Sequence, residues 1–108
     1  MNIQKNDDEH LDARAAERGD VAVVVDVRVS GGFKTKARLL DLSQTGFRMD
    51  CMTVFAPDQL LFMTIPTFAQ LESRIVWRHH LTYGCAFVRP LYGAIFEHIL
   101  KAHPAFDQ

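Results

Sequence analysis

The sequence predicts an all-β fold, namely a six-stranded antiparallel β-barrel followed by a C-terminal α-helix. Short segments in which apolar and polar residues alternate recur between residues 21 and 88 and are rich in valine and isoleucine. This pattern is typical of strands with one buried face. Glycine, proline or polar residues separate the segments, as in tight turns. A helical stripe of apolar residues follows Pro90, and closure into a barrel would leave no exposed edge strand.

The first three strands are predicted between residues 21 and 51. The segment from Val21 to Val29 carries a valine at every second position, and Ser30-Gly31-Gly32 then marks a hairpin. A second strand is predicted from about Lys34 to Leu42, and a third from Phe47 to Cys51. Between them, the stretch from Asp41 to Gly46 interrupts the alternation, and it contains more polar groups than a plain turn requires.

Three more strands are predicted after a loop at residues 55–58. Leu60 to Ile65 forms the fourth strand, and Pro66 closes it. Thr82 to Val88 forms the sixth strand, which pairs with the fifth across a turn near residues 79–81. One face of the fifth strand is predicted to lie in the core, and so are three methionines. These core residues are Leu71, Ser73, Ile75, Trp77, Met49, Met52 and Met63.

The last predicted element is a helix over residues 91–102. Pro90 ends the sheet, because proline cannot donate a hydrogen bond to a strand ladder. Leu91, Ile95 and Ile99 then recur every fourth residue. This stripe predicts a helix whose apolar face packs on the sheet.

Composition limits the class of protein. The 108 residues suit one domain, and the hydrophobic fraction of 48% predicts a packed core. Residues 1–12 are polar and charged, so we expect a flexible N-terminal leader rather than a signal peptide. Apolar runs are all shorter than a membrane span, so we expect a cytoplasmic protein with no membrane insertion. Cys51 and Cys85 are then expected to be free, buried thiols.

Charge and residue spacing argue against three classes of function. The net charge of −1 argues against binding of long nucleic acid. His79 and His80 are adjacent, so they point to opposite faces of a strand, and no metal site is expected. Asp41 and Ser43 lie close together, but no histidine is placed to act as their base. We therefore expect no enzyme activity and no cofactor.

The stretch Asp41-Leu-Ser-Gln-Thr-Gly46 is the first candidate for a binding site. On a strand, Asp41 and Ser43 project from the same face. Gly46 either adopts a positive φ or lets another group approach the backbone closely. The carboxylate can accept bonds from adjacent N–H donors, such as N1–H and N2–H₂ of guanine. The alternative is a turn held by local hydrogen bonds, which needs no ligand.

Two arginines form the second candidate. Arg14 and Arg18 lie four residues apart, just before the first strand and in an otherwise acidic segment. Guanidinium groups bind phosphates bidentately, bond to O6 and N7 of guanine, and stack on its face. A segment that carries both can fold over a ligand resting on the barrel. The alternative is a solvated pair of charges.

Together the two motifs resemble the PilZ domain family. Its signature is an R-x-x-x-R segment followed, after one hairpin, by [D/N]-x-S-x-x-G. This chain has Arg14 to Arg18 and then Asp41 to Gly46. The last hairpin is also similar to the family's, with Gly84 and Phe87 in a G-x-x-F arrangement. The likeness covers about residues 13–103, in which residues 13–20 would form a ligand-binding arm.

The resemblance implies a receptor for cyclic di-GMP, a bacterial second messenger. Arg14 and Arg18 would bind its phosphates and the Hoogsteen edge of guanine. Asp41 and Ser43 would hold a guanine, and Gly46 would keep the turn open beneath it. Binding would order the arm against the barrel, and an unidentified signalling or motility protein would respond to this change.

The alternative within the family is a protein-interaction module with weak or no binding of cyclic di-GMP. Two departures from the family pattern bear on it. Ala13 stands where many members have a further arginine, which favours one bound ligand molecule over a stacked pair. Phe47 follows the second motif, where glycine or alanine is frequent, and it either packs inward or crowds the site.

Overall fold

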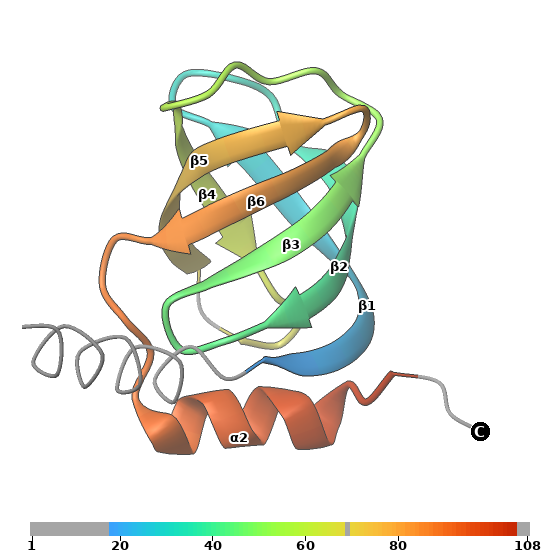
Figure 1. Cartoon of the computed structure of the whole chain (residues 1–108), viewed down its shortest axis with the longest axis vertical. Helices are drawn as coiled ribbons and strands as arrows, with labels where there is room; N and C mark the ends of the chain where they lie inside the picture. Colours follow the sequence, from blue (N-terminus) through green and yellow to red (C-terminus); the bar gives the residue numbers. More distant parts are fainter. Residues whose placement is uncertain (1–17, 69, 106–108) are drawn as a thin grey trace, which may run out of the picture.

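Six antiparallel strands close into a barrel in the order β1-β2-β3-β6-β5-β4, and one helix lies across one end of it (Figure 1). The computed structural model describes residues 18–68 and 70–105. The predicted fold class is confirmed. The elements are β1 (Gly19–Val29), β2 (Thr35–Leu42), β3 (Gly46–Cys51), β4 (Leu60–Thr64), β5 (Gln70–His79), β6 (Thr82–Phe87) and α2 (Gly93–Ala102).

The long first strand closes the barrel. β1 pairs with β2 along most of its length and with β4 over its second half, from Asp26 to Val29. The alternation in the sequence sets its two faces: Val21 and Val25 are buried, whereas Val24 lies on the outer surface. Because β1 is paired on both sides, the first and last edges of the sheet are joined.

A β-bulge moves Trp77 out of the predicted core. Ser73 and Ile75 are fully buried as expected, but the pairing of β5 with β6 shifts between Ile75 and Trp77. One extra residue, Val76, lies in β5 at this point, and an extra residue reverses the alternation of the side chains that follow. Trp77 is therefore on the outer face and 42% exposed. The prediction that it lies in the core was wrong.

The prediction for Met52 was also wrong, whereas Met49 and Met63 are fully buried in the barrel. Met52 is 81% exposed, because it follows the inward-facing Cys51 and lies three positions after Met49, so the alternation of β3 directs it to the outer face. Beyond that residue the chain turns into the β3–β4 loop. The core at this end is closed instead by Phe55, whose backbone N–H donates to the hydroxyl of Tyr83 at 2.9 Å.

Helix α2 begins two residues later than predicted. Leu91 is buried, but it precedes the helix and bonds to the β2–β3 loop: its N–H donates to the carbonyl of Gln44, and its carbonyl accepts from Nε2 of Gln44. From Gly93, α2 buries Phe96 and Ile99 against the open end of the barrel (Figure 1). This docking on the sheet was expected. No helix in the described ranges is long and apolar enough to cross a membrane.

Both cysteines are free and buried, as the sequence predicted. Burial raises the pKa of the Cys85 thiol to about 12, and the neighbouring Cys51 adds to the effect. A thiol with this pKa is almost entirely protonated at pH 8 and does not act as a nucleophile.

We expect both thiols to resist a water-soluble disulfide reagent at pH 8 until the protein unfolds. At that pH about one Cys85 side chain in ten thousand is ionised, given its pKa of about 12. Absorbance of the released reagent, followed with and without denaturant, measures the rate. Reaction of either cysteine in the native protein as fast as a free thiol would contradict their burial.

Candidate functional site

A row of cross-strand neighbours brings the candidate residues together on the outer face of the barrel. Asp41 on β2 is paired with Arg48 on β3, and Arg48 is paired with Gly84 on β6. Gly84 is paired in turn with Trp77 on β5. Because neighbouring strands lie about 4.8 Å apart, this row extends over about 14 Å.

A bulge in β2 determines the direction of the Asp41 side chain. The pairing of β2 with β3 shifts between Leu39 and Asp41, so Leu40 is the extra residue. Leu39 and Leu42 both point into the core and are fully buried. Without the extra residue, Asp41 would share the inward face of Leu39. The bulge therefore places a carboxylate on the outside without interrupting the core.

Two arginines hold the carboxylate of Asp41. Nη1 of Arg18 donates to Oδ1 at 2.8 Å, and Nε of Arg48 donates to Oδ2 at 2.6 Å. Asp41 is only 2% exposed, and a buried carboxylate without partners is strongly unfavourable. Both arginine side chains remain about half exposed. The cluster of two cations and one anion carries a net charge of +1, so it attracts a further anion.

Ser43 holds the turn that follows β2. The strand ends at Leu42, so Ser43 lies beyond it, and its side chain is buried. Its hydroxyl oxygen accepts bonds from the backbone N–H groups of Thr45 and Gly46, both at 3.1 Å. Its own N–H donates to the carbonyl of Gly46 at 2.8 Å. These local hydrogen bonds are the ones expected of a turn that needs no ligand. Contact of Ser43 with a ligand stays a prediction.

Gly46 is required by close backbone packing. Its φ is not positive, so of the two roles predicted for it the close approach of another group to the backbone remains. A Cβ at this position would lie 2.2 Å from the carbonyl oxygen of Cys85 on β6. The glycine thus lets β3 and β6 approach at the start of their ladder, two residues before Arg48 of the row.

Trp77 lies over a second glycine. A Cβ on Gly84 would lie 2.1 Å from the indole ring, so the ring rests on the backbone of β6. The hollow beside it has a volume of about 200 Å³ and is lined by Arg18, Gly46, Trp77 and Gly84, among others. An aromatic face and a guanidinium group therefore border one shallow surface depression.

Comparison with known protein families shows to which family the chain belongs. The model of the PilZ domain matches residues 12–101, which is most of the sequence. The chain belongs to the PilZ domain family. This family comprises receptors that bind cyclic di-GMP, and its members are regulatory binding modules that are generally not enzymes.

A solved PilZ domain has a similar fold. The crystal structure of the PilZ domain of CeSA from a cellulose-synthesizing bacterium matches with a TM-score of 0.57 and 14% identity, over 80% of this chain and 92% of that chain. At this identity the likeness shows the fold alone. An uncharacterized protein from Legionella matches with a TM-score of 0.42 and 10% identity, over 72% and 80% of the two chains. No curated protein matches the chain.

The PilZ signature residues are brought together in part. Arg18 reaches Asp41 across 23 positions of sequence, so the end of the R-x-x-x-R segment lies against the second motif. Arg14 lies outside the described residues. Phe47 points into the core, where its ring centroid is 5.3 Å from that of Phe87. Phe47 was expected either to pack inward or to crowd the site. It packs inward and leaves the outer face free.

Arg48 and Trp77 are part of the site, although sequence reasoning missed both. The alternation of β3 places Arg48 on the outer face, and its position seven residues after Asp41 could have indicated a cross-strand partner. Trp77 was missed because one bulge reverses the face of the residues that follow it. Gly84 could have indicated the position of Trp77, since a glycine within a strand often marks a close approach of another group.

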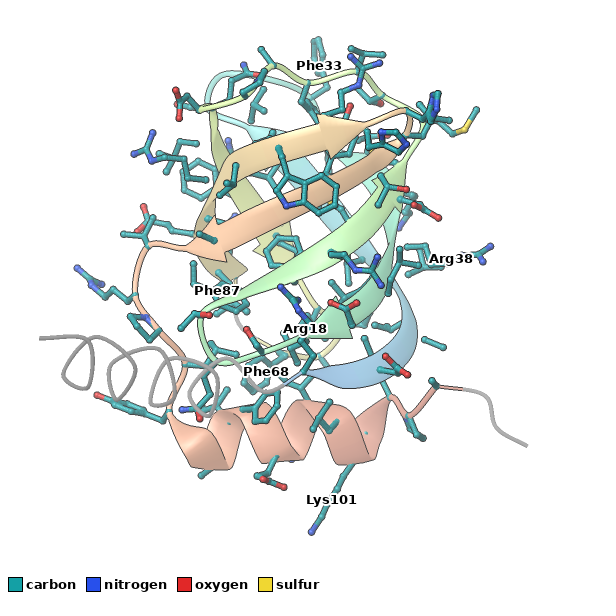
Figure 2. All side chains as sticks on the ribbon, viewed as in Figure 1. Arg18, Phe33, Arg38, Phe68, Phe87 and Lys101 are labelled. Atoms are coloured by element: carbon teal, nitrogen blue, oxygen red, sulfur yellow. The ribbon has the colours of Figure 1, made fainter. Side chains whose placement is uncertain are left out.

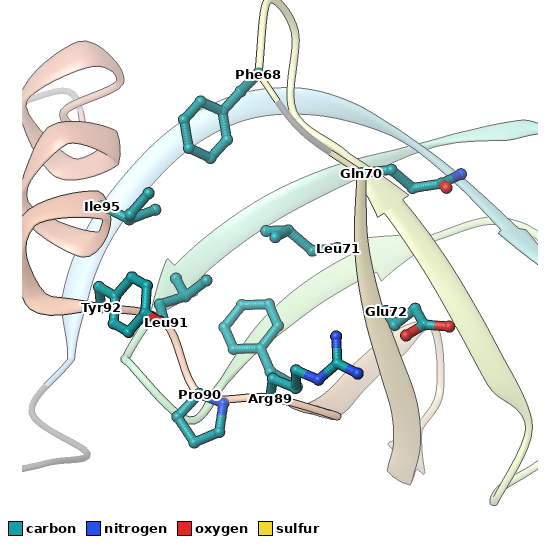
Figure 3. Close-up of a pocket in the computed structure, with 10 residues that line it drawn as sticks. Phe68, Gln70, Leu71, Glu72, Arg89, Pro90, Leu91, Tyr92 and Ile95 are labelled. Carbon is teal, nitrogen blue, oxygen red and sulfur yellow. The ribbon is translucent and has the colours of Figure 1, made fainter.

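A larger hollow lies between β5 and the start of α2 (Figure 3). It has a volume of about 350 Å³, and its wall is mainly apolar, with the side chains of Phe68, Leu71, Tyr92 and Ile95 around it. Glu72 and Arg89 are the charged residues among those that line it. The described residues contain no cluster of three or more potential metal ligands.

Replacement of Gly46 by alanine is expected to destabilise the protein by about 3 kcal/mol or more, because the new methyl group overlaps backbone that cannot move freely. Gly93→Ala is the control: a Cβ there contacts nothing within 4 Å, and alanine favours the helix. We expect the control to leave stability unchanged or to raise it by up to about 1 kcal/mol. Urea unfolding measures both changes, and equal stability of the two variants would contradict the close approach.

Proposed function

We propose that this PilZ domain is a receptor for cyclic di-GMP that acts through a partner protein. The observation that carries the proposal is the contact of Arg18 with Asp41 at 2.8 Å, because it joins both halves of the PilZ signature at one place. The alternative is a PilZ-like interaction module with weak or no binding of this ligand. The complete second motif and the hollow of about 200 Å³ beside Arg18 and Gly46 support the receptor over that alternative.

The ion pairs of Asp41 suggest how a guanine is received. Guanine offers two adjacent donors, N1–H and N2–H₂, and the carboxylate now accepts two guanidinium N–H bonds. A base that brings its own donors can therefore take the place of Arg18, while Arg48 keeps its bond to the second oxygen. This exchange leaves the carboxylate paired at every stage, which avoids the cost of a buried bare charge.

The guanidinium group of Arg18 is then free to bind the rest of the ligand. It lies at the edge of the barrel with its side chain half exposed. Bidentate pairing with a phosphate is a favourable arrangement for a guanidinium group. Arg14, four residues earlier, is proposed to bind the same ligand from the arm formed by residues 13–20. Both arginines on one ligand would fix the arm against the barrel, and this change is what a partner would recognise.

Trp77 provides an aromatic face for a base. The row from Asp41 to Trp77 extends over about 14 Å, so two parts of a dinucleotide can occupy its two ends. Stacking of a base on an aromatic side chain contributes about 1–3 kcal/mol. Ser43 is proposed to act mainly by holding the loop, and Gly46 by keeping the strands close beneath the ligand.

Isothermal titration of the purified chain with cyclic di-GMP tests the proposal. We expect micromolar or tighter binding, and a loss of at least tenfold in affinity for Arg14→Ala, Arg18→Ala and Asp41→Ala. Arg28→Ala is the matched control, because Arg28 lies over the ring of Phe62 at 4.6 Å on the distant half of β1. Circular dichroism verifies that each variant is folded. Absence of heat from the wild-type protein would end the receptor hypothesis and favour the interaction module.

The fluorescence of Trp77 is expected to report binding, because this residue is the single tryptophan of the chain. A base that stacks on the indole should quench its emission in proportion to the heat of titration. Trp77→Ala should lower the affinity about tenfold, and Trp77→Phe should lower it less, since phenylalanine retains a stacking face. Unchanged emission at a ligand concentration that saturates the titration would show that the ligand does not reach Trp77.

A further inference from the structure

The end of the barrel opposite α2 carries exposed apolar side chains on three separate loops. Phe33, in the β1–β2 connection, is 94% exposed (Figure 2). Met52 and Val54, in the β3–β4 loop, and Leu81, in the β5–β6 turn, are also exposed. We call these four residues the apolar tips. Single exposed apolar residues are ordinary, but here each of the three loops at one end of the barrel has at least one.

The apolar tips contribute little to the core. Phe55 and Tyr83 already close the barrel beneath them, and the hydroxyl of Tyr83 is bonded on both sides, to Phe55 N–H and to the carbonyl of Thr53. The hairpin at residues 30–34 needs a glycine at its turn, where Gly31 has a φ of 79°, but it does not need a phenylalanine. Folding therefore does not account for the apolar tips.

Basic residues surround the apolar tips. The exposed basic residues on these loops and on the adjoining parts of the strands are Lys34, Lys36, Arg74 and Arg78. Asp58 is the only exposed acid in the same region, all of which the structure describes. Two further acids are half-buried and paired: Asp26 with Lys36 at 2.8 Å, and Asp50 with the hydroxyl of Thr82 at 2.7 Å. This end of the barrel thus combines apolar tips with an excess of positive charge.

We propose that the apolar tips dock on an anionic membrane surface. A hollow of about 310 Å³ separates Phe33 from Val54, and a second hollow lies between Met52, Leu81 and the outer face of β2. The apolar residues are thus separate projections rather than one continuous patch, whereas a stable protein interface needs a continuous, closely fitting core. Lipids can fill the spaces between the projections. Apolar residues that enter the interface, with basic residues at the level of anionic headgroups, are a recognised mode of peripheral binding.

Docking at this end leaves the Arg18–Asp41 end of the candidate nucleotide site accessible. Arg18 lies near α2, whereas Phe33 lies at the other end of the molecule (Figure 2). Between them β1 contributes eleven residues, or roughly 35 Å of extended chain. Membrane docking therefore leaves the Arg18 end of the candidate site exposed to solvent, and the membrane proposal does not rest on the proposed function.

Co-sedimentation with vesicles tests the proposal. The full chain, without added nucleotide, is mixed with vesicles of phosphatidylcholine alone or of phosphatidylcholine with about one third phosphatidylglycerol, at about 0.1 M salt. We expect binding to the anionic vesicles only. About 0.5 M salt should weaken it several-fold, because salt screens the attraction between the basic residues and the lipid headgroups.

Two variants locate the contact. Phe33→Ser combined with Val54→Ser should lower the vesicle partition coefficient at least tenfold, and unfolding measurements show whether it stays folded. Tyr92→Ser is the matched control, because Tyr92 is an aromatic residue of similar exposure (81%) beside α2, at the opposite end. We expect the control to bind vesicles like the wild-type protein.

Three results would overturn the proposal. They are no sedimentation of the wild-type protein with anionic vesicles, equal binding to both kinds of vesicle, or an equal loss in the double variant and the control. In the first case the apolar tips remain available to a protein partner with an acidic surface, which is the competing occupant.

Discussion

The buried carboxylate of Asp41 needs cationic partners, and the arrangement of the outer face depends on how this need is met. Arg18 and Arg48 approach it from different parts of the chain, one from the segment before β1 and one from β3. The same contacts place two half-exposed arginine side chains at one edge of the barrel, with an excess of one positive charge. An arrangement that stabilises the fold is therefore also suited to receive an anion, and it joins the two motifs of the PilZ signature.

Local backbone irregularities determine which side chains reach this face. The bulge at Leu40 turns Asp41 outward between two buried leucines, and the bulge at Val76 does the same for Trp77. In both cases one extra residue changes the face of a side chain while the hydrophobic core stays intact. The two glycines, Gly46 and Gly84, act in a related way, since each allows another group to lie directly on the backbone.

Much of the fold could be predicted from the sequence because it depends on strict periodicity. The valines of β1 and the stripe of α2 fall on the faces that their spacing indicates. What could not be predicted depends on single positions where periodicity ends or shifts. Trp77 follows a bulge, which leaves no signal in the alternation. The error at Met52 was avoidable, because a residue directly after the inward-facing Cys51 belongs to the outer face. For the site, the motifs indicated Arg18 and Asp41, but the bond between them and the contribution of Arg48 required the three-dimensional register.

The bonding of Leu91 to Gln44 has a mechanical consequence. Gln44 is inside the D-x-S-x-x-G motif, and it binds both the N–H and the carbonyl of Leu91, two residues before α2 begins. Thr45, the next residue of the motif, accepts a bond from the N–H of Phe87 at the end of β6. Hydrogen bonds thus hold the loop that carries the signature against the segment between β6 and α2. A displacement of that loop would therefore also displace the start of α2. The position of α2 at the end of the barrel therefore depends on the position of the motif loop.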